Sequence, residues 1–389
     1  CLTLPGPTIT LLVVMIRVGN HVVIQKMGGE HLRVCKISRK TKILIEKLRF
    51  EIDGAIDQPF GLFEVIFVNS AARLHGYSSS KLNGISSTTN NRRSSAEEAS
   101  SDNAAQTRQK VTQDEIIKMK DTGVPAEQLI AKLVDGSASF SERTVYSQNK
   151  YINKKAKKHS DHVYLLKPTL RLIAESYYKK DPERVAHLRI DLLSHLLALS
   201  GIHYGSRCVV FEQCLGLLTS AVLTRLGGSG ACIHLHRGNI AQAIPCVDSM
   251  DFDKEVYFYL KFNFFQDESA VTDSSLERRA ERQRLQRHAW HLMQNGEIEI
   301  LFIASKNINP VEILEKTWSF LRLSSTIVIY CPIPLYSAYH WLKAKHAVQV
   351  HVVDAFYRSH QIIQDRSHPI MQQFITGGVI LSAIKVEQR

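Results

Sequence analysis

The residues of this chain that could do chemistry lie between positions 208 and 218, where an apolar run leads into an acid and a glycine. Residues 208–211 are apolar, Glu212 follows, and Gly216 comes four residues later. Such a strand and turn can hold a nucleotide cofactor, because glycines let the backbone turn tightly and approach the ligand. That turn needs glycine at alternate positions, but Cys214 and Leu218 occupy two of them. The pattern favours a packed turn that binds nothing.

The next apolar run weakens the cofactor interpretation further. In enzymes that use S-adenosylmethionine, the strand after this turn should end in a carboxylate that accepts hydrogen bonds from the ribose. Here residues 232–236 end in His236, and Arg237 follows. Neither side chain can replace that acceptor, so the sequence predicts no cofactor site in this chain.

The elements around the turn alternate between strands and helices. Apolar runs at 208–212, 232–236, 298–304 and 326–330 predict strands, with helices between them, and residues 219–226 predict the helix after the turn. Residues 348–353 and 379–384 predict a final antiparallel pair. Asp181 and Pro182 begin a predicted helix whose apolar stripe is Val185, Leu188, Leu192, Leu196 and Leu199. The fold class is therefore α/β, with a degenerate Rossmann-like methyltransferase domain at 166–389.

The first half of the chain has a different pattern. Short apolar runs at 22–24, 32–37, 43–45 and 62–68 predict a small β-barrel-like domain at 15–76. The Ser-, Asn- and Thr-rich stretch 77–110 predicts a disordered linker or loop. A helical, basic segment is expected at 111–165, where Thr112 and Glu115 form a capping-box start for a helix reaching Lys120, and a second helix covers 125–133. Residues 1–14 are a possible non-native leader, because Met15 directly precedes the first strand.

Composition limits the classes of protein. The chain has 389 residues, of which 22% are charged and 44% hydrophobic, and its apolar stretch at 8–16 is too short to cross a membrane. Seven cysteines without a CxxC pair argue against a disulfide scaffold or a zinc site and for a reducing compartment. The pairs His234/His236 and His288/His291 lack further ligands nearby, so no metal site is predicted.

The net charge of +12 indicates a polyanionic partner, most simply nucleic acid. Residues 143–180 hold ten Lys or Arg and two acids, a net +8. A solvated charged face is the alternative for this run. A second basic run at 278–287 lies beside Glu277 and Glu281 at helical spacing and favours a surface helix with internal ion pairs over RNA contact. The RNA-binding candidates are Lys150, Lys154, Lys155, Lys157, Lys158, Lys167, Arg171, Arg358 and Arg366; the last two could instead fix the loop of the final hairpin.

Short motifs spread over most of the chain beyond residue 15 resemble a known family. They include Asp57-Gln-Pro-Phe-Gly61, Ser147-Gln-Asn-Lys-Tyr151, Lys167-Pro-Thr-Leu170, Lys180-Asp-Pro182, Gly227-Gly-Ser-Gly230 and Arg366-Ser-His-Pro369. Each is weak alone, but together they resemble the non-catalytic subunit of the eukaryotic tRNA (adenine-58-N1) methyltransferase.

That resemblance implies an N-terminal barrel-like domain and a methyltransferase fold without its cofactor site. It implies pairing with a catalytic sister subunit that binds S-adenosylmethionine, assembly of two such pairs into a heterotetramer that holds tRNA, and a nuclear location. In the catalytic sister the fourth strand ends at an aspartate that contacts the adenine. Here residues 301–305 carry no acid and Lys306 follows them.

The function expected is therefore a tRNA-binding, scaffolding subunit that makes no methyl transfer itself. Two alternatives remain at this point: an active RNA methyltransferase with an atypical cofactor turn, and a free-standing RNA-binding protein without an enzyme partner.

Overall fold

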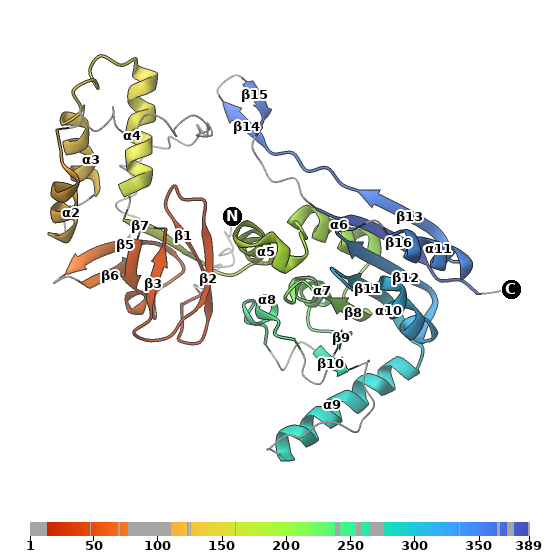
Figure 1. The fold of residues 1–389 in the computed structure, drawn as a ribbon. Coiled ribbons are helices and arrows are strands. Elements are labelled where there is room, and N and C mark those ends of the chain that lie inside the picture. Colours follow the sequence, from red (N-terminus) through yellow and green to blue (C-terminus); the bar gives the residue numbers. More distant parts are fainter. Residues whose placement is uncertain are drawn as a thin grey trace, which may run out of the picture. The chain divides into compact units, whose positions relative to one another are not determined.

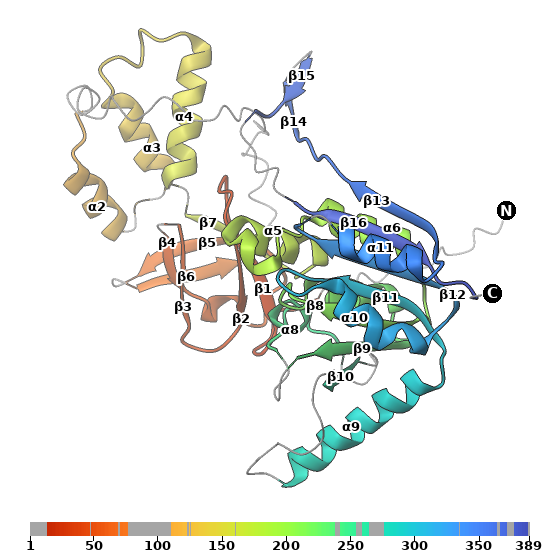
Figure 2. The ribbon, with the colours of Figure 1, turned by 45° about the vertical axis from the view of Figure 1, so that its right-hand side comes forward.

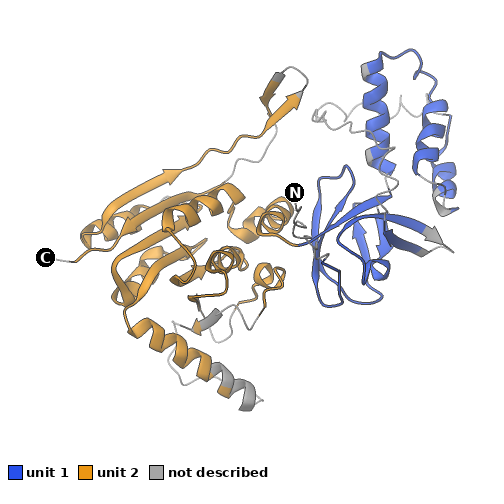
Figure 3. Cartoon of the chain, turned by 180° about the vertical axis from the view of Figure 1, so that it is seen from behind, with its two compact units in different colours: residues 1–167 blue, residues 168–389 orange. Residues whose placement is uncertain are grey.

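The computed structural model divides the chain into two units, residues 1–167 and residues 168–389 (Figure 3). The structure describes residues 14–46, 48–68, 71–76, 110–122, 124, 126–159, 161–237, 242–253, 259–263, 276–333, 335–363, 366–371 and 377–387. The leader expected at 1–14 and the linker expected at 77–110 therefore lie outside the described residues, apart from Val14 and Lys110. Among the described helices, none is both long and apolar enough to span a bilayer.

The first unit is built on a seven-stranded sheet in the order β2-β1-β7-β5-β6-β4-β3 (Figure 1). Its strands are β1 (His21–Lys26), β2 (Leu32–Lys36), β3 (Lys42–Ile45), β4 (Leu48–Glu51), β5 (Gly61–Val68), β6 (Ala71–Gly76) and β7 (His162–Leu166), with a short 3-10 turn η1 (Asp53–Ala55) after β4. Alternate side chains point to one shared core, which includes Ile24, Ile43, Phe50, Phe63 and Leu165. This nearly closed, barrel-like sheet confirms the predicted N-terminal fold.

Strand β7 closes this sheet from a distant part of the chain. It pairs antiparallel with both β1 and β5, with Val23 opposite Leu166 and Gly61 opposite Leu165. Residues 162–165 were expected to belong to the helical segment 111–165, and this prediction is wrong because they form a strand. The buried positions Val163 and Leu165 alternate with half-buried neighbours, which is the period-2 pattern of a strand. Five residues of that pattern are too few to show where the strand pairs.

In the described part of the chain between β6 and β7 lie the helices α2 (Gln113–Asp121), α3 (Ala126–Asp135) and α4 (Val145–His159). The predicted capping box at the start of α2 is present. The Thr112 amide donates to Glu115 Oε2 at 3.1 Å, and the Glu115 amide donates to Thr112 Oγ1 at 3.4 Å. These reciprocal bonds satisfy two amides that the first helical turn leaves without backbone partners.

The second unit contains a seven-stranded sheet in the order β10-β9-β8-β11-β12-β16-β13. Its strands are β8 (Arg207–Glu212), β9 (Ala231–His236), β10 (Tyr259–Asn263), β11 (Ile298–Ala304), β12 (Leu321–Cys331), β13 (Val348–Asp354) and β16 (Val379–Ile384). The first five are parallel, whereas β16 runs antiparallel to both β12 and β13. The order reverses between β8 and β11, which is where open α/β sheets place their ligands.

Helices accompany this sheet in the alternating pattern expected from the sequence (Figure 1). They are α5 (Leu170–Lys180), η3 (Pro182–Val185), α6 (Ile190–Ser200), α7 (Leu217–Leu226), α8 (Pro245–Asp248), α9 (Leu276–Gln294), α10 (Pro310–Thr317), η4 (Trp318–Phe320) and α11 (Tyr336–Ala344). The single helix predicted after Asp181 is wrong in one respect. Ala186 and His187 have φ of 50° and 57°, so the chain breaks between η3 and α6. Val185, Leu188, Leu192 and Leu196 are nevertheless buried as the apolar stripe requires.

A two-stranded hairpin, β14 (His360–Ile363) and β15 (Arg366–Pro369), connects β13 to β16 and extends away from the sheet of its unit (Figure 2). We call the described residues 355–363 and 366–371 the arm. The buried Arg189 holds the base of the arm, since it donates to the carbonyl of Ala355 at 2.8 Å and forms a bidentate pair with Asp191. Gly377, on the returning chain, lies so close that a Cβ there would be 2.5 Å from the Arg189 guanidinium.

The Gly227–Gly230 turn between α7 and β9 is structural, and Gly230 shows why. Its φ is +80°, and a Cβ on it would lie 2.2 Å from the Ser206 carbonyl oxygen. We expect Gly230→Ala to destabilise the second unit by about 2–3 kcal/mol, since it adds a backbone clash to the cost of a left-handed residue. Gly201→Ala is the matched control. Gly201 has φ +65° with nothing within 4 Å of its Cβ position, so only about 1 kcal/mol should be lost.

Tryptophan fluorescence during urea unfolding would measure both variants. The chain's three tryptophans, Trp290, Trp318 and Trp341, all lie in the second unit, so the signal reports that unit. Equal losses for the two glycine variants would contradict the close approach at Gly230.

Candidate functional site

The turn after β8 lies at the carboxyl end of a strand that is buried between β9 and β11. Glu212 ends this strand and is itself buried. Its carboxylate accepts hydrogen bonds from the amides of Leu218 at 3.1 Å and Thr219 at 2.7 Å, and from the Thr219 hydroxyl. Leu218 and Thr219 belong to the first turn of α7, so Glu212 caps this helix from the preceding strand. Burial raises the pKa of Glu212, whereas the hydrogen bonds from Thr219, Leu218 and Gly216 oppose that rise.

The two side chains that replace glycines in the turn point into the protein. Cys214 and Leu218 are both completely buried, and burial raises the pKa of the Cys214 thiol well above its usual range. They are therefore part of the packing around α7.

The one glycine that remains in the turn is needed for contact with α8. Gly216 has φ +83°, and a Cβ there would lie 2.7 Å from Cβ of Ile244. The Cys246 amide also donates to the Leu215 carbonyl at 3.1 Å. The chain after β9 thus packs directly on the backbone that a cofactor would have to approach.

Gln213, for which no role was predicted, joins this turn to the loop after β11. Its backbone amide donates to the Ala304 carbonyl at 2.9 Å. Its side-chain Oε1 accepts from the backbone amides of Lys306 at 2.7 Å and Asn307 at 3.1 Å. The two loops flank the point where the strand order reverses, so these bonds hold the edges of the potential ligand crevice together. A polar residue directly after the acid was the only signal available in the sequence.

The other two strand ends carry the residues expected from the sequence. His236 is buried at the end of β9, and Arg237 is exposed and pairs with Glu312 at 3.6 Å. After β11, Lys306 pairs with Glu183 at 3.7 Å. Within the described ranges, no three His, Cys, Asp or Glu side chains are grouped as a metal site would require.

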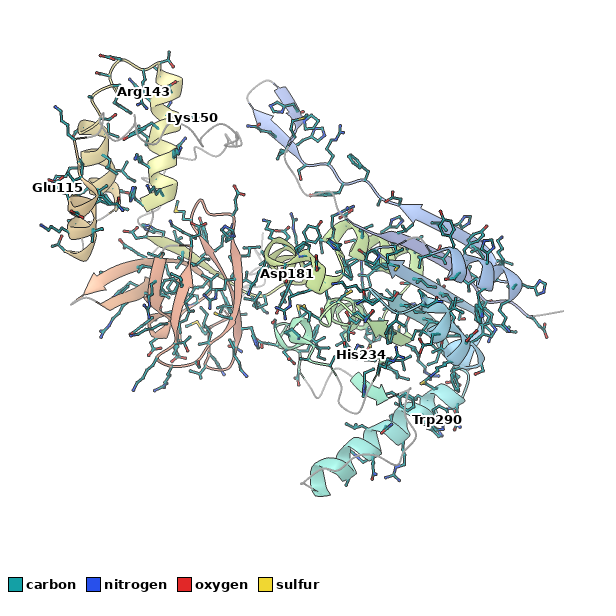
Figure 4. All side chains as sticks on the ribbon, in the orientation of Figure 1. Glu115, Arg143, Lys150, Asp181, His234 and Trp290 are labelled. Atoms are coloured by element: carbon teal, nitrogen blue, oxygen red, sulfur yellow. The ribbon has the colours of Figure 1, made fainter. Side chains whose placement is uncertain are left out.

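The predicted RNA-binding lysines are brought together on α4. Lys150, Lys154 and Lys158 recur at four-residue spacing and are exposed, so they form one stripe along the helix (Lys150 is labelled in Figure 4). We call these three residues the α4 stripe. The side chain of Lys157 lies outside the description.

Tyr151 anchors the α4 stripe to the rest of the helical insertion. Its hydroxyl donates to the Leu133 carbonyl of α3 at 3.2 Å, and its ring lies 5.7 Å from that of Phe140. The Arg143 guanidinium and Lys155 Nζ lie 5.1 and 5.3 Å from the ring centroid, within the range of cation–π contacts. Burial lowers the pKa of Lys155, and the positive charges of Lys158 and Lys154 lower it further.

The remaining candidates lie elsewhere in the chain. Lys167 is exposed directly after β7, in the first unit. In the second unit, Arg171 is exposed on α5 and donates to Glu175 Oε1 at 3.0 Å, and Arg358 is exposed on the arm beside the ring of Phe356. Arg366 begins β15, and its side chain lies outside the description. The structure therefore groups the lysines of α4 on one helix, whereas the other candidates belong to other elements of the chain.

Known proteins resemble the chain over nearly its whole length. The tRNA (adenine(58)-N(1))-methyltransferase non-catalytic subunit trm6 of Dictyostelium discoideum is 28% identical over 417 residues, which cover 96% of this chain and 80% of that protein. The subunit of the same name from Mus musculus is 26% identical and covers 95% of this chain and 88% of its own length.

A solved structure supports the fold alone. The SAM-dependent O-methyltransferase of Thermotoga maritima superposes with a TM-score of 0.50 over 98% of each chain, at 10% identity. The Gcd10p family matches residues 15–287. Since that match extends over more than half of the 389 residues, this chain belongs to the Gcd10p family.

Proposed function

We infer that this chain is the non-catalytic subunit of a tRNA (adenine-58-N1) methyltransferase. The observation that carries this inference is the near full-length similarity to relatives that bear this name. Catalysis then belongs to a partner subunit, and this chain contributes by positioning tRNA and by completing the assembly. The substitutions at the turn after β8 and at the ends of β9 and β11 agree with that division of labour.

This chain is proposed to bind no S-adenosylmethionine, which the catalytic partner would hold. Cys214 and Leu218 are buried where a functional turn has glycine, and Ile244 packs against Gly216. A bound nucleotide would have to displace these groups and the Gln213 bonds. In equilibrium dialysis with labelled S-adenosylmethionine, the chain alone should show no saturable binding. Saturable binding would refute this part of the proposal and favour an active methyltransferase.

The catalytic subunit is proposed to dock on the arm, and two such pairs would form a heterotetramer in the nucleus. Phe356, Ile362 and Met371 of the arm are 65%, 67% and 89% exposed. Exposed large apolar side chains such as these are unfavourable in water and typical of protein interfaces. The Arg189 contact to Ala355 holds the base of the arm.

A methyl-transfer assay tests the function as a whole. Transfer from labelled S-adenosylmethionine to tRNA would be measured with this chain alone, with the catalytic subunit of the same organism alone, and with both. We expect transfer only in the mixture. Transfer by this chain alone would overturn the non-catalytic assignment. Transfer that does not depend on this chain would favour a free-standing RNA-binding protein.

The α4 stripe is proposed to contact tRNA phosphates. Replacing Lys150, Lys154 and Lys158 by glutamine removes three charges, and each lost phosphate contact lowers the slope of log K against log salt by roughly 0.7–0.9. We expect tRNA to bind the assembled complex roughly ten- to a hundredfold more weakly at physiological salt, with a slope reduced by about 2–3. Fluorescence anisotropy of labelled tRNA over a range of KCl concentrations would measure both quantities.

The matched control replaces three other exposed lysines by glutamine, Lys118, Lys316 and Lys343. The same total charge is lost, but these residues are spread over α2, α10 and α11. If both triple variants weaken binding equally, the α4 stripe contributes only net charge and is not a contact site.

A further inference from the structure

A second group of cations lies in the first unit, at the turn between β2 and β3. Lys36, Arg39 and Lys40 are exposed within five residues of chain, and Arg17 is exposed on the neighbouring turn that precedes β1. Backbone bonds connect the two turns, since the Gly19 amide donates to the Ile37 carbonyl at 2.9 Å and the Ile37 amide donates to the Asn20 carbonyl at 2.8 Å. We call Arg17, Lys36, Arg39 and Lys40 the β2–β3 cluster.

The backbone that carries the β2–β3 cluster is held in one shape. The Lys40 amide donates to Asp53 Oδ1 at 2.7 Å, and the hydroxyls of Ser38 and Thr41 are 2.6 Å apart. Ile37 is buried in the core of the sheet and anchors the turn. Binding of a ligand here would therefore cost little conformational entropy, because the loop is already ordered.

The charges of this cluster are not neutralised within the described chain. No carboxylate in the described ranges lies within 4 Å of the side-chain nitrogens of these four residues, whereas the nearby Lys42 pairs with Glu51 at 3.7 Å. Asp53 accepts a hydrogen bond from the backbone of Lys40, and the Asp57 amide donates to the carbonyl of Ile16, next to Arg17. The four positive charges outnumber these two carboxylates and would attract a polyanion.

We propose that the β2–β3 cluster is a second contact site for the phosphate backbone of RNA, separate from the α4 stripe. This proposal rests on the proposed tRNA-binding function and adds a location to it. Besides the four cations, the two turns expose the side chains of Val18 and Ser38, and none of these residues is aromatic. Cations without base-stacking rings recognise phosphates and helix shape rather than base sequence.

The test compares three variants of the complex with its catalytic subunit: Lys36→Gln/Arg39→Gln/Lys40→Gln, the α4 triple variant and the dispersed lysine control. Fluorescein-labelled tRNA would be titrated over a range of KCl concentrations. For the β2–β3 variant we expect binding that is roughly ten- to a hundredfold weaker at physiological salt and a slope lower by about 2–3. The substituted side chains are exposed, so the melting temperature should stay the same. The reduction should also be similar for an unrelated RNA hairpin, since the site reads backbone.

The outcomes separate this inference from the function on which it rests. Weaker binding in the α4 variant with unchanged binding in the β2–β3 variant would overturn the second site and leave the proposed function intact. Unchanged binding in both would contradict the tRNA-contact role itself. If the β2–β3 variant instead failed to assemble with the catalytic subunit while its binding to tRNA alone was unchanged, the cluster would be a protein contact and the RNA proposal would be wrong.

Discussion

The double substitution Phe356→Asp/Ile362→Asp is expected to prevent association with the catalytic subunit and so to abolish methyl transfer by the mixture. If the arm is the docking surface, each replacement removes an apolar contact that contributes about 1.5–3 kcal/mol and buries a carboxylate without a partner. Association should therefore weaken at least roughly a hundredfold, since each 1.4 kcal/mol is a factor of ten. Light scattering after gel filtration and titration calorimetry of the two subunits would measure this loss.

The control for the arm is Leu323→Asp. Leu323 lies on β12 of the same unit and is 55% exposed, close to the exposure of Phe356. This variant should associate normally, and all variants should unfold at the wild-type urea concentration because their side chains are already in water. Normal association of the Phe356/Ile362 variant would show that the partner binds elsewhere.

Glu212→Ala is expected to lower the stability of the second unit by about 3–5 kcal/mol. The substitution leaves two buried amides and the Thr219 hydroxyl without their acceptor, and each unsatisfied donor costs about 1–3 kcal/mol. It also leaves the start of α7 without its cap. Tryptophan fluorescence during urea unfolding would measure the change in the free energy of unfolding.

Two further substitutions make this prediction specific. Thr219→Val removes only the hydroxyl donor and should cost about 1 kcal/mol. Glu175→Ala removes a carboxylate from the exposed i,i+4 pair with Arg171, which contributes about 0.3–0.5 kcal/mol. A loss at Glu212 no larger than that at Glu175 would mean that the buried carboxylate is not a structural cap.

The strands of the second unit were predictable because each is a continuous apolar run. Residues 208–212 and 298–304 belong to strands of a parallel sheet that is covered on both faces. Such strands have nearly continuous apolar sequences, in which apolar and polar residues do not alternate. The break at Ala186 and His187 was not predictable. Both residues adopt left-handed φ values although neither is glycine or asparagine, the residues that usually indicate this conformation. The Tyr330 hydroxyl, 144 positions along the chain, donates to the Ala186 carbonyl at 2.8 Å.

Some features of the candidate site could likewise be predicted from the sequence, and others could not. Loss of the glycines at Cys214 and Leu218 and the concentration of lysines on α4 could be read directly from residue types. The roles of Glu212 and Gln213 could not, because the atoms they meet are identified only when the strand, the helix and the loop after β11 are placed. Likewise the β2–β3 cluster depends on Arg17, which the bonds of Gly19 and Asn20 to Ile37 bring beside the next turn.

The sequence by itself determined most of the strands and helices of the second unit, the side chains that stand at positions 214 and 218 of the turn after β8, and the stretch in which positive charge accumulates. These properties depend on side-chain chemistry and spacing within a few residues. Only the tertiary structure decided that β7 closes the first sheet, that Ile244 at the start of α8 packs against Gly216, that Gln213 joins the turn after β8 to the loop after β11, and that Arg189 holds the base of the arm. Those contacts join residues that are distant along the chain. Each contact depends on the burial and hydrogen bonding of two surfaces, and a local sequence pattern describes only one of them.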